Sequence, residues 1–121
     1  MARHLPDVIA TASNHVTALT IASGVVSVDC SLGDYFTLAM TANVTSLTFS
    51  NVPAAGTGRT LCIDVAQDAT GGRTLALPAS FKAIGNSDTA IQSAANAKTR
   101  IIASTTDGGA TWVYAMSKVA A

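Results

Sequence analysis

The residues that could carry out acid–base, nucleophilic or metal chemistry are few and scattered along this chain of 121 residues. Its two histidines, His4 and His15, lie near the start of the sequence, and neither stands at a spacing typical of zinc ligands. No combination of serine, histidine and aspartate follows a catalytic pattern. All seven acidic residues are Asp, and their positions do not indicate the pair of carboxyl groups that a glycosidase needs. We therefore expect no enzyme activity, no catalytic residue, no metal site and no cofactor.

The two cysteines, Cys30 and Cys62, are too few for a disulfide scaffold and do not have the spacing of metal ligands. Both lie in strand-like segments, where a buried free thiol behaves as a small apolar residue. We expect two free, buried thiols, and a disulfide between them is the alternative.

The sharpest local motif is residues 105–112, Thr-Thr-Asp-Gly-Gly-Ala-Thr-Trp, which resembles the Asp-box hairpin of sialidases and other propeller proteins. An aspartate at this place accepts hydrogen bonds from turn amides, the two glycines permit positive φ, and the tryptophan covers the turn. A propeller would need several copies of the motif, and the chain has one. The expected structural turn consists of Asp107, Gly108, Gly109, Thr111 and Trp112.

A second glycine-rich segment, residues 67–73, contains Asp68, Gly71 and Gly72. A phosphate-binding loop would be followed by a helix, whereas a strand-like run follows here. A calcium site would need clustered oxygen ligands, which the segment does not show. We interpret Asp68, Gly71 and Gly72 as a second structural turn.

The elements that position these turns are predicted by period-two alternation of apolar residues, broken by turn residues. The only helix candidate, residues 90–97, is long enough for at most one turn. Short strands at this spacing indicate an all-β fold, which we expect to be a single antiparallel β-sandwich or jelly-roll-like barrel. The expected strands are residues 16–22, 25–29, 35–41, 45–50, 60–67, 73–77, 98–105 and 111–117.

The first fifteen residues lack this alternation and are interrupted by Pro6, which predicts an extended N-terminal arm over 1–15 and a β domain over 16–121. The arm has too few apolar residues to form its own core. We expect it to contact the particle or a neighbouring subunit, and a disordered arm is the alternative. The residues expected to make these contacts are Arg3, His4, Leu5 and Pro6.

Charge and hydrophobicity limit the partners of the chain. Its formal net charge is +0 with no basic patch, so we expect no nucleic-acid partner. No uninterrupted apolar segment is long enough to span a bilayer, so we expect no membrane partner. Only 12% of the residues are charged while 49% are hydrophobic. A small domain of this composition is prone to self-association, so we expect other subunits to cover much of its surface.

Several segments, in this order and spacing, together resemble a domain that recurs in structural proteins of tailed bacteriophages. The resemblance covers about residues 25–117, and it departs from the family pattern at Cys30, where an apolar residue is usual, and at Leu77, where an aromatic residue is common. The segments that carry it are residues 28–37, 43–45, 67–74, 78–80, 94–97 and 105–112.

The resemblance implies a non-enzymatic virion structural protein. We expect a capsid decoration (cement) protein that binds and stabilises the outer capsid surface, because the short chain starts at Met1 and carries its own arm. The alternative is a tail- or head-fibre module that contacts the host surface. The implied partners are copies of the chain in a homotrimer and the major capsid protein or other virion proteins. The implied location is the exterior of the virion, after assembly in the host cytoplasm, where both cysteines stay reduced.

Overall fold

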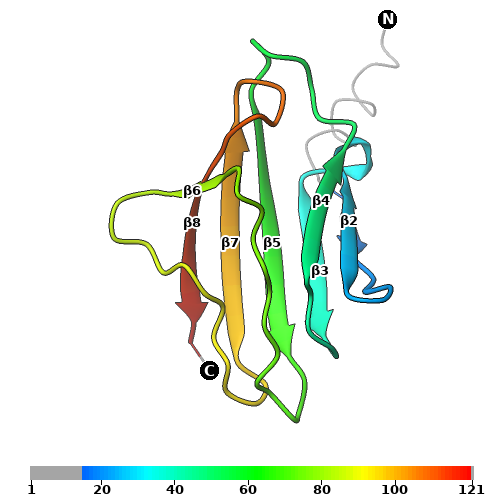
Figure 1. The fold of residues 1–121 in the computed structure, drawn as a ribbon, viewed down its shortest axis with the longest axis vertical. Coiled ribbons are helices and arrows are strands. Elements are labelled where there is room, and N and C mark those ends of the chain that lie inside the picture. The colour runs from blue at the N-terminus through cyan, green and yellow to red at the C-terminus, as the bar shows by residue number, and fades with distance from the viewer. Residues whose placement is uncertain (1–14, 121) are drawn as a thin grey trace, which may run out of the picture.

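The computed structural model describes residues 15–120, which form eight strands in two sheets (Figure 1). A short 3-10 turn, η1 (Cys30–Leu32), follows β2 and is capped by Asp29, whose Oδ1 accepts a hydrogen bond from the Ser31 amide at 2.9 Å. The strands are β1 (Val16–Ala18), β2 (Val25–Asp29), β3 (Tyr35–Met40), β4 (Ser46–Ser50), β5 (Arg59–Gln67), β6 (Phe81–Ala83), β7 (Lys98–Thr105) and β8 (Trp112–Val119).

Alternation of apolar and polar residues decides which face of each strand is buried. In β3, Phe36, Leu38 and Met40 are at most 1% exposed, whereas their neighbours Tyr35 and Thr37 point to the other side. The same pattern runs through β2, β7 and β8. Because successive side chains of a strand point to opposite faces, one face of each strand joins the core. The predicted all-β class is therefore confirmed.

The first five strands wind between the two sheets. The larger sheet has the order β1-β3-β5-β7-β8-β6, and the smaller sheet pairs β2 with β4. Strands β1, β3 and β5 are neighbours and parallel, and the chain passes through β2 or β4 of the other sheet between them. Parallel strands need such a crossover, which here is a strand of the opposite sheet instead of a helix.

The pairing differs from the uniformly antiparallel arrangement that the alternation led us to expect. Only β5–β7 and β7–β8 are antiparallel among the pairs in residues 15–120, while β1–β3, β3–β5, β2–β4 and β6–β8 are parallel. The larger sheet is therefore mixed. Alternation reports which face of a strand is buried and carries no information about the direction of its neighbour.

The core lies on one side of the larger sheet. Strands β2 and β4 cover part of this side, and the connection from β5 to β7, coloured green to yellow in Figure 1, crosses the rest. Leu75, Leu77 and Ile91 of this connection pack against the buried cluster. Among residues 15–120 no element covers the opposite side of the sheet, which we call the outer face.

Four segments differ from the sequence prediction, and the first is the expected strand at residues 16–22, of which only β1 forms. The expected strand at residues 73–77 is reduced to one parallel bridge between Leu75 and Val44, since only the backbone next to Leu75 meets Val44. The strand β6 was not predicted, because three residues are too short to show alternation. The helix candidate at residues 90–97 forms a bend and a turn at its C-terminal end, and no helix.

Candidate functional site

The outer face is built from the alternate residues of six strands that do not enter the core. Strand register places these side chains in rows across the sheet. Nine of its eighteen members are small, being Ala, Ser, Thr or Cys. Its members are Val16, Ala18, Tyr35, Thr37, Ala39, Thr60, Cys62, Asp64, Ala66, Lys82, Lys98, Arg100, Ile102, Ser104, Val113, Ala115, Ser117 and Val119.

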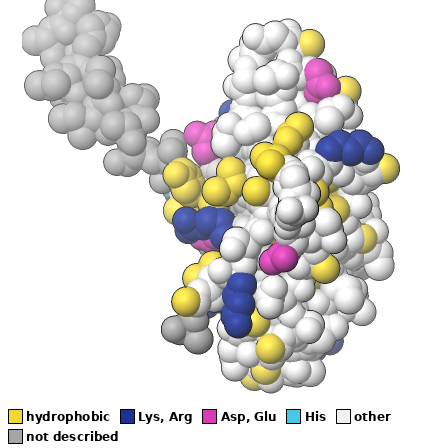
Figure 2. Space-filling model, turned by 90° about the vertical axis from the view of Figure 1, so that its left-hand side faces the viewer, with side chains coloured by type: hydrophobic (Ala, Val, Ile, Leu, Met, Phe, Trp, Pro, Cys, Tyr) yellow, Lys and Arg dark blue, Asp and Glu magenta, His cyan; other side chains and the backbone are white. Residues whose placement is uncertain are grey.

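One row of the outer face is apolar from β1 across to β8. Val16 of β1, Tyr35 of β3, Cys62 of β5, Ile102 of β7 and Ala115 of β8 are successive register partners. Val16, Tyr35 and Ile102 are 55%, 42% and 48% exposed. Figure 2 views the molecule from the side of β8 and β6, and hydrophobic side chains there form a band next to charged ones. An exposed apolar row of this length is unusual for a free surface and indicates a contact site.

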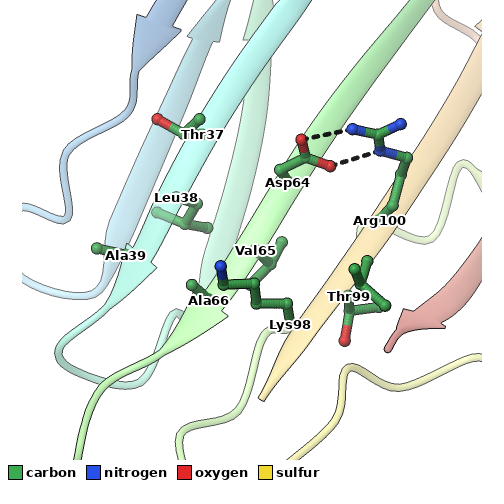
Figure 3. Close-up of a pocket in the computed structure, with 10 residues that line it drawn as sticks. Thr37, Leu38, Ala39, Asp64, Val65, Ala66, Lys98, Thr99 and Arg100 are labelled. Atoms are coloured by element: carbon green, nitrogen blue, oxygen red, sulfur yellow. Dashed lines mark hydrogen bonds and ion pairs between the residues drawn. The ribbon is translucent and has the colours of Figure 1, made fainter. Parts of the chain in front are cut away.

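A shallow groove of about 570 Å³ lies beside this row, between β3, β5, β7 and the end of β8. Its lining includes the ion pair of Asp64 and Arg100, which Figure 3 shows pointing toward each other from adjacent strands. Arg100 Nε donates to Asp64 Oδ1 at 2.7 Å, and Arg100 Nη2 donates to Oδ2 at 2.9 Å. Hydrogen bonding by the guanidinium holds the pKa of Asp64 below its usual value and raises the pKa of Arg100. Both side chains therefore stay ionised at neutral pH, and each is the hydrogen-bond partner of the other.

A second hollow of about 370 Å³ lies on the other side of Arg100 and is lined by Tyr35, Cys62 and Ile102. Cys62 is only 8% exposed, because the larger side chains beside it cover its thiol. Burial raises the pKa of Cys62, and the nearby carboxylate of Asp64 adds to this effect. The thiol is thus kept in its protonated, weakly nucleophilic form.

The carboxylates of the outer face and its second hollow are held in ion pairs. Asp64 is engaged by Arg100, and Asp34, which lines the second hollow, has its Oδ1 2.9 Å from Arg59 Nε. Within residues 15–120 no three His, Cys, Asp or Glu side chains cluster as metal ligands. Cys30 and Cys62 are both free and buried, Cys30 in the core and Cys62 on the outer face.

The first predicted turn lies between β7 and β8. Asp107 Oδ1 accepts hydrogen bonds from Thr105 Oγ1 and from the Thr111 amide, both at 2.9 Å, and the Gly109 amide donates to Thr105 Oγ1 at 3.0 Å. Gly108 and Gly109 have φ of 73° and 87°, which residues with a Cβ rarely adopt. The Thr111 amide is the main cause of the lowered pKa of Asp107.

Trp112, which follows this turn, lies in an aromatic cluster on the core side. Its ring centroid is 4.8 Å from that of Phe49 and 6.1 Å from that of Phe81, and Phe81 also packs on Tyr114 at 5.4 Å. Trp112 is 1% exposed. Trp112 therefore packs β8 against β4 and β6, and it is not part of the outer face.

The second predicted turn follows β5. Asp68 Oδ1 accepts from the amides of Thr70 and Gly71 at 3.1 and 2.9 Å, while Arg73 Nη2 donates to Asp68 Oδ2 at 3.1 Å. Gly71 and Gly72 have φ of 70° and 73°. The Gly71 amide is the first cause of the lowered pKa of Asp68.

Gln67 holds the second turn to the rest of the fold, and no sequence pattern indicates this role. Its Nε2 donates to the carbonyls of Arg73 and Gln92 at 2.8 and 3.0 Å, and its Oε1 accepts from the Arg73 amide at 3.1 Å. A Cβ on Gly71 would lie 2.7 Å from the Ala95 amide nitrogen. Two loops therefore meet closely here, which only the tertiary structure reveals.

The structure does not bring the predicted residues into one site. The two turns lie at opposite ends of the long strands (Figure 1), and the expected arm contacts Arg3, His4, Leu5 and Pro6 lie outside the described residues. Sequence reasoning missed the outer face as a site. Its one visible signal was Asp64, which stands opposite the apolar residues of β5.

Comparison with known families adds the decisive observation. Residues 26–111 match the model of the family described as "Putative phage tail fibre C-terminal domain". The chain belongs to this family. Its members are structural parts of the virion, so the chain is a virion-associated bacteriophage structural protein, and the predicted relationship to phage structural proteins is confirmed.

The tail fibre domain match begins in β2 and ends directly before β8, so it includes the second predicted turn, the first predicted turn up to Thr111, and the central strands of the sheet. No curated protein and no solved structure matches the chain. In the part of the chain that the structure describes, no helix has the length and apolar character needed to cross a bilayer.

Proposed function

We propose that the chain is a bacteriophage tail-fibre module that contacts the host surface, in place of the expected capsid decoration role. The observation that carries the proposal is the family match, which covers 86 of the 121 residues. A fibre module needs a rigid scaffold that presents loops at one end. The eight strands supply the scaffold, and their connections gather at its two ends (Figure 1).

One of these ends fits host contact better than the other. Residues before Val16 enter the fold at the start of β1, which is parallel to β3 and β5, so the ends of these strands lie away from the chain entry. The loops at this distal end are tied together. The Asn96 amide donates to the Asp68 carbonyl at 3.0 Å, and the Gly72 amide donates to the Ser93 carbonyl at 2.7 Å.

The distal loops present small, exposed side chains on a fixed backbone. Ala69, Thr70 and residues 93–96 are all exposed. Preorganised loops lose little conformational entropy on binding, which favours recognition. We propose that the distal loops touch the host, and that the module works by binding without enzyme activity, since the described groove offers only the engaged carboxylate of Asp64.

Immunogold electron microscopy tests the location. Antibodies against the purified chain, applied to virions of the phage that encodes it, are expected to label the tail fibres, and preincubation with the purified chain should abolish the label. Labelling spread over the head would support decoration and would overturn the fibre proposal.

Adsorption competition tests the host contact. Purified chain added to host cells at micromolar concentration is expected to slow phage adsorption. Ala94→Glu, at the distal end, should weaken this competition, whereas Ala55→Glu, at the opposite end, is the matched control and should not. Equal competition by both variants and the parent would contradict the assignment of the distal loops.

A further inference from the structure

The outer face holds most of the large hydrophobic side chains that are exposed among residues 15–120. Of the eight large hydrophobic side chains that are exposed among residues 15–120, five lie on this face: Val16, Tyr35, Ile102, Val113 and Val119. Within this part of the chain nothing covers them. Leaving this surface in water is unfavourable by roughly 25 cal/mol per Å².

The size of the face suits a stable protein contact. The six strands of the sheet hold 37 residues, and each residue covers about 16 Å² of the sheet, because strands lie about 4.8 Å apart and rise about 3.3 Å per residue. The face therefore covers about 600 Å², and a contact between two such faces would bury about 1,200 Å² in total, above the roughly 1,000 Å² that a specific interface needs. Ala66, Ala115 and Ser117 keep it flat enough for close approach.

The charges of the face suit a partner with the same face. Asp64 and Arg100 neutralise each other within one chain, so a second copy can cover them without burying an unpaired charge. Lys82 lies on the edge strand β6, and Lys98 is the first residue of β7, so both ammonium groups can stay in water at the rim. A glycan would instead need several exposed aromatic rings and free polar groups, and Tyr35 is the only aromatic ring of the face.

We infer that the outer face is the surface through which copies of this chain assemble, with the row around Ile102 at the centre of the contact and the Asp64–Arg100 pair inside it. The inference goes beyond the proposed fibre role and stands without it, since it rests on the exposure, area and charge of this face alone. A different virion protein as the occupant is the competing outcome of the test.

The test compares two aspartate substitutions at side chains of matched exposure. Ile102 is 48% exposed on the outer face, and Leu32 is 51% exposed in η1, which is not part of the outer face. Size-exclusion chromatography coupled to light scattering, at about 50 µM, is expected to give a multiple of the chain mass for the parent and for Leu32→Asp. Ile102→Asp is expected to give a single chain mass, because two carboxylates would be desolvated at the centre of the contact.

Folding is checked independently by the urea midpoint and the emission of Trp112, the single tryptophan, which lies on the core side. If Ile102→Asp proves unfolded, Val113→Lys on the neighbouring strand β8 replaces it and is expected to give the same dissociation. A monomeric parent, an Ile102→Asp variant that keeps the parent mass, or a Leu32→Asp variant that dissociates equally would each overturn the inference. A monomeric parent would not contradict the proposed location in the tail fibre, because that location is tested separately by immunogold labelling of virions.

Discussion

Asp64 and Arg100 are directly opposed in the antiparallel register of β5 and β7, and their side chains are joined by two hydrogen bonds of 2.7 and 2.9 Å on the outer face. In one chain the side chains are 43% and 52% exposed, so the pair contributes little to the stability of the isolated fold. If copies of the chain cover the pair, its integrity matters for assembly far more than for folding.

Arg100→Ala is therefore expected to weaken assembly by about tenfold or more, because Asp64 would be buried without a partner. The measurement is the dissociation constant from analytical ultracentrifugation. The double variant Asp64→Ala/Arg100→Ala is the control and should recover most of the lost affinity, since it leaves no unpaired charge. Equal dissociation constants for Arg100→Ala and the parent would place the pair outside the contact.

Trp112→Ala is expected to lower the free energy of unfolding by about 3–5 kcal/mol, because it removes a fully buried aromatic ring from its packing on Phe49 and Phe81. Urea denaturation measures the loss. Val113→Ala is the control. The Val113 side chain, next to Trp112 in the sequence, is 44% exposed on the outer face, so this substitution should lower the free energy of unfolding far less in a monomeric background. Similar losses for the two variants would contradict the assignment of the core side.

Asp107→Ala is expected to lower the urea midpoint, because the Thr111 amide and the Thr105 hydroxyl lose their common acceptor in the turn. Asp88→Ala, in the exposed loop after β6, is the control and should leave the midpoint unchanged. An unchanged midpoint for Asp107→Ala would show that the turn amides find water as an equal partner.

Acid is expected to destabilise the fold. Hydrogen bonds hold the pKa values of Asp29, Asp64, Asp68 and Asp107 below their ordinary value in the folded chain. Groups with a lowered folded pKa stabilise the fold above the unfolded pKa of about 3.9, and this contribution is lost as the pH falls through the folded values. Urea midpoints should therefore be level between about pH 5 and 7 and should fall below about pH 4. Asp107→Asn should show a smaller fall than the parent.

The homotrimer implied by the phage resemblance stays a prediction. Closed symmetry allows one face to be reused without open-ended growth, and three outer faces around a threefold axis would enclose the apolar row of Tyr35 and Ile102. Light scattering should give about three times the mass of 12.2 kDa. A mass of two chains would keep the outer face as the contact but replace the threefold arrangement by a twofold one.

Local sequence determined most of the strands and the two turns. Apolar alternation placed Phe36, Leu38 and Met40 on the buried side of β3, and the structure agrees. The Asp and Gly residues of the turn at residues 105–111 make backbone and side-chain contacts within a few positions of each other, so their arrangement follows from short-range chemistry.

Tertiary structure alone decided the directions of the strands, the hydrogen bonds of Gln67 to Arg73 and Gln92, and which residues make up the outer face. Asp64 and Arg100 are 36 residues apart, and they meet only because β5 and β7 pair in one register. Alternation shows that Tyr35 and Ile102 point away from the core but not that they join one row, since that depends on which strands become neighbours. Neighbours are chosen by the packing of the whole chain, where the parallel crossovers through β2 and β4 replace the antiparallel hairpins that short-range patterns favour.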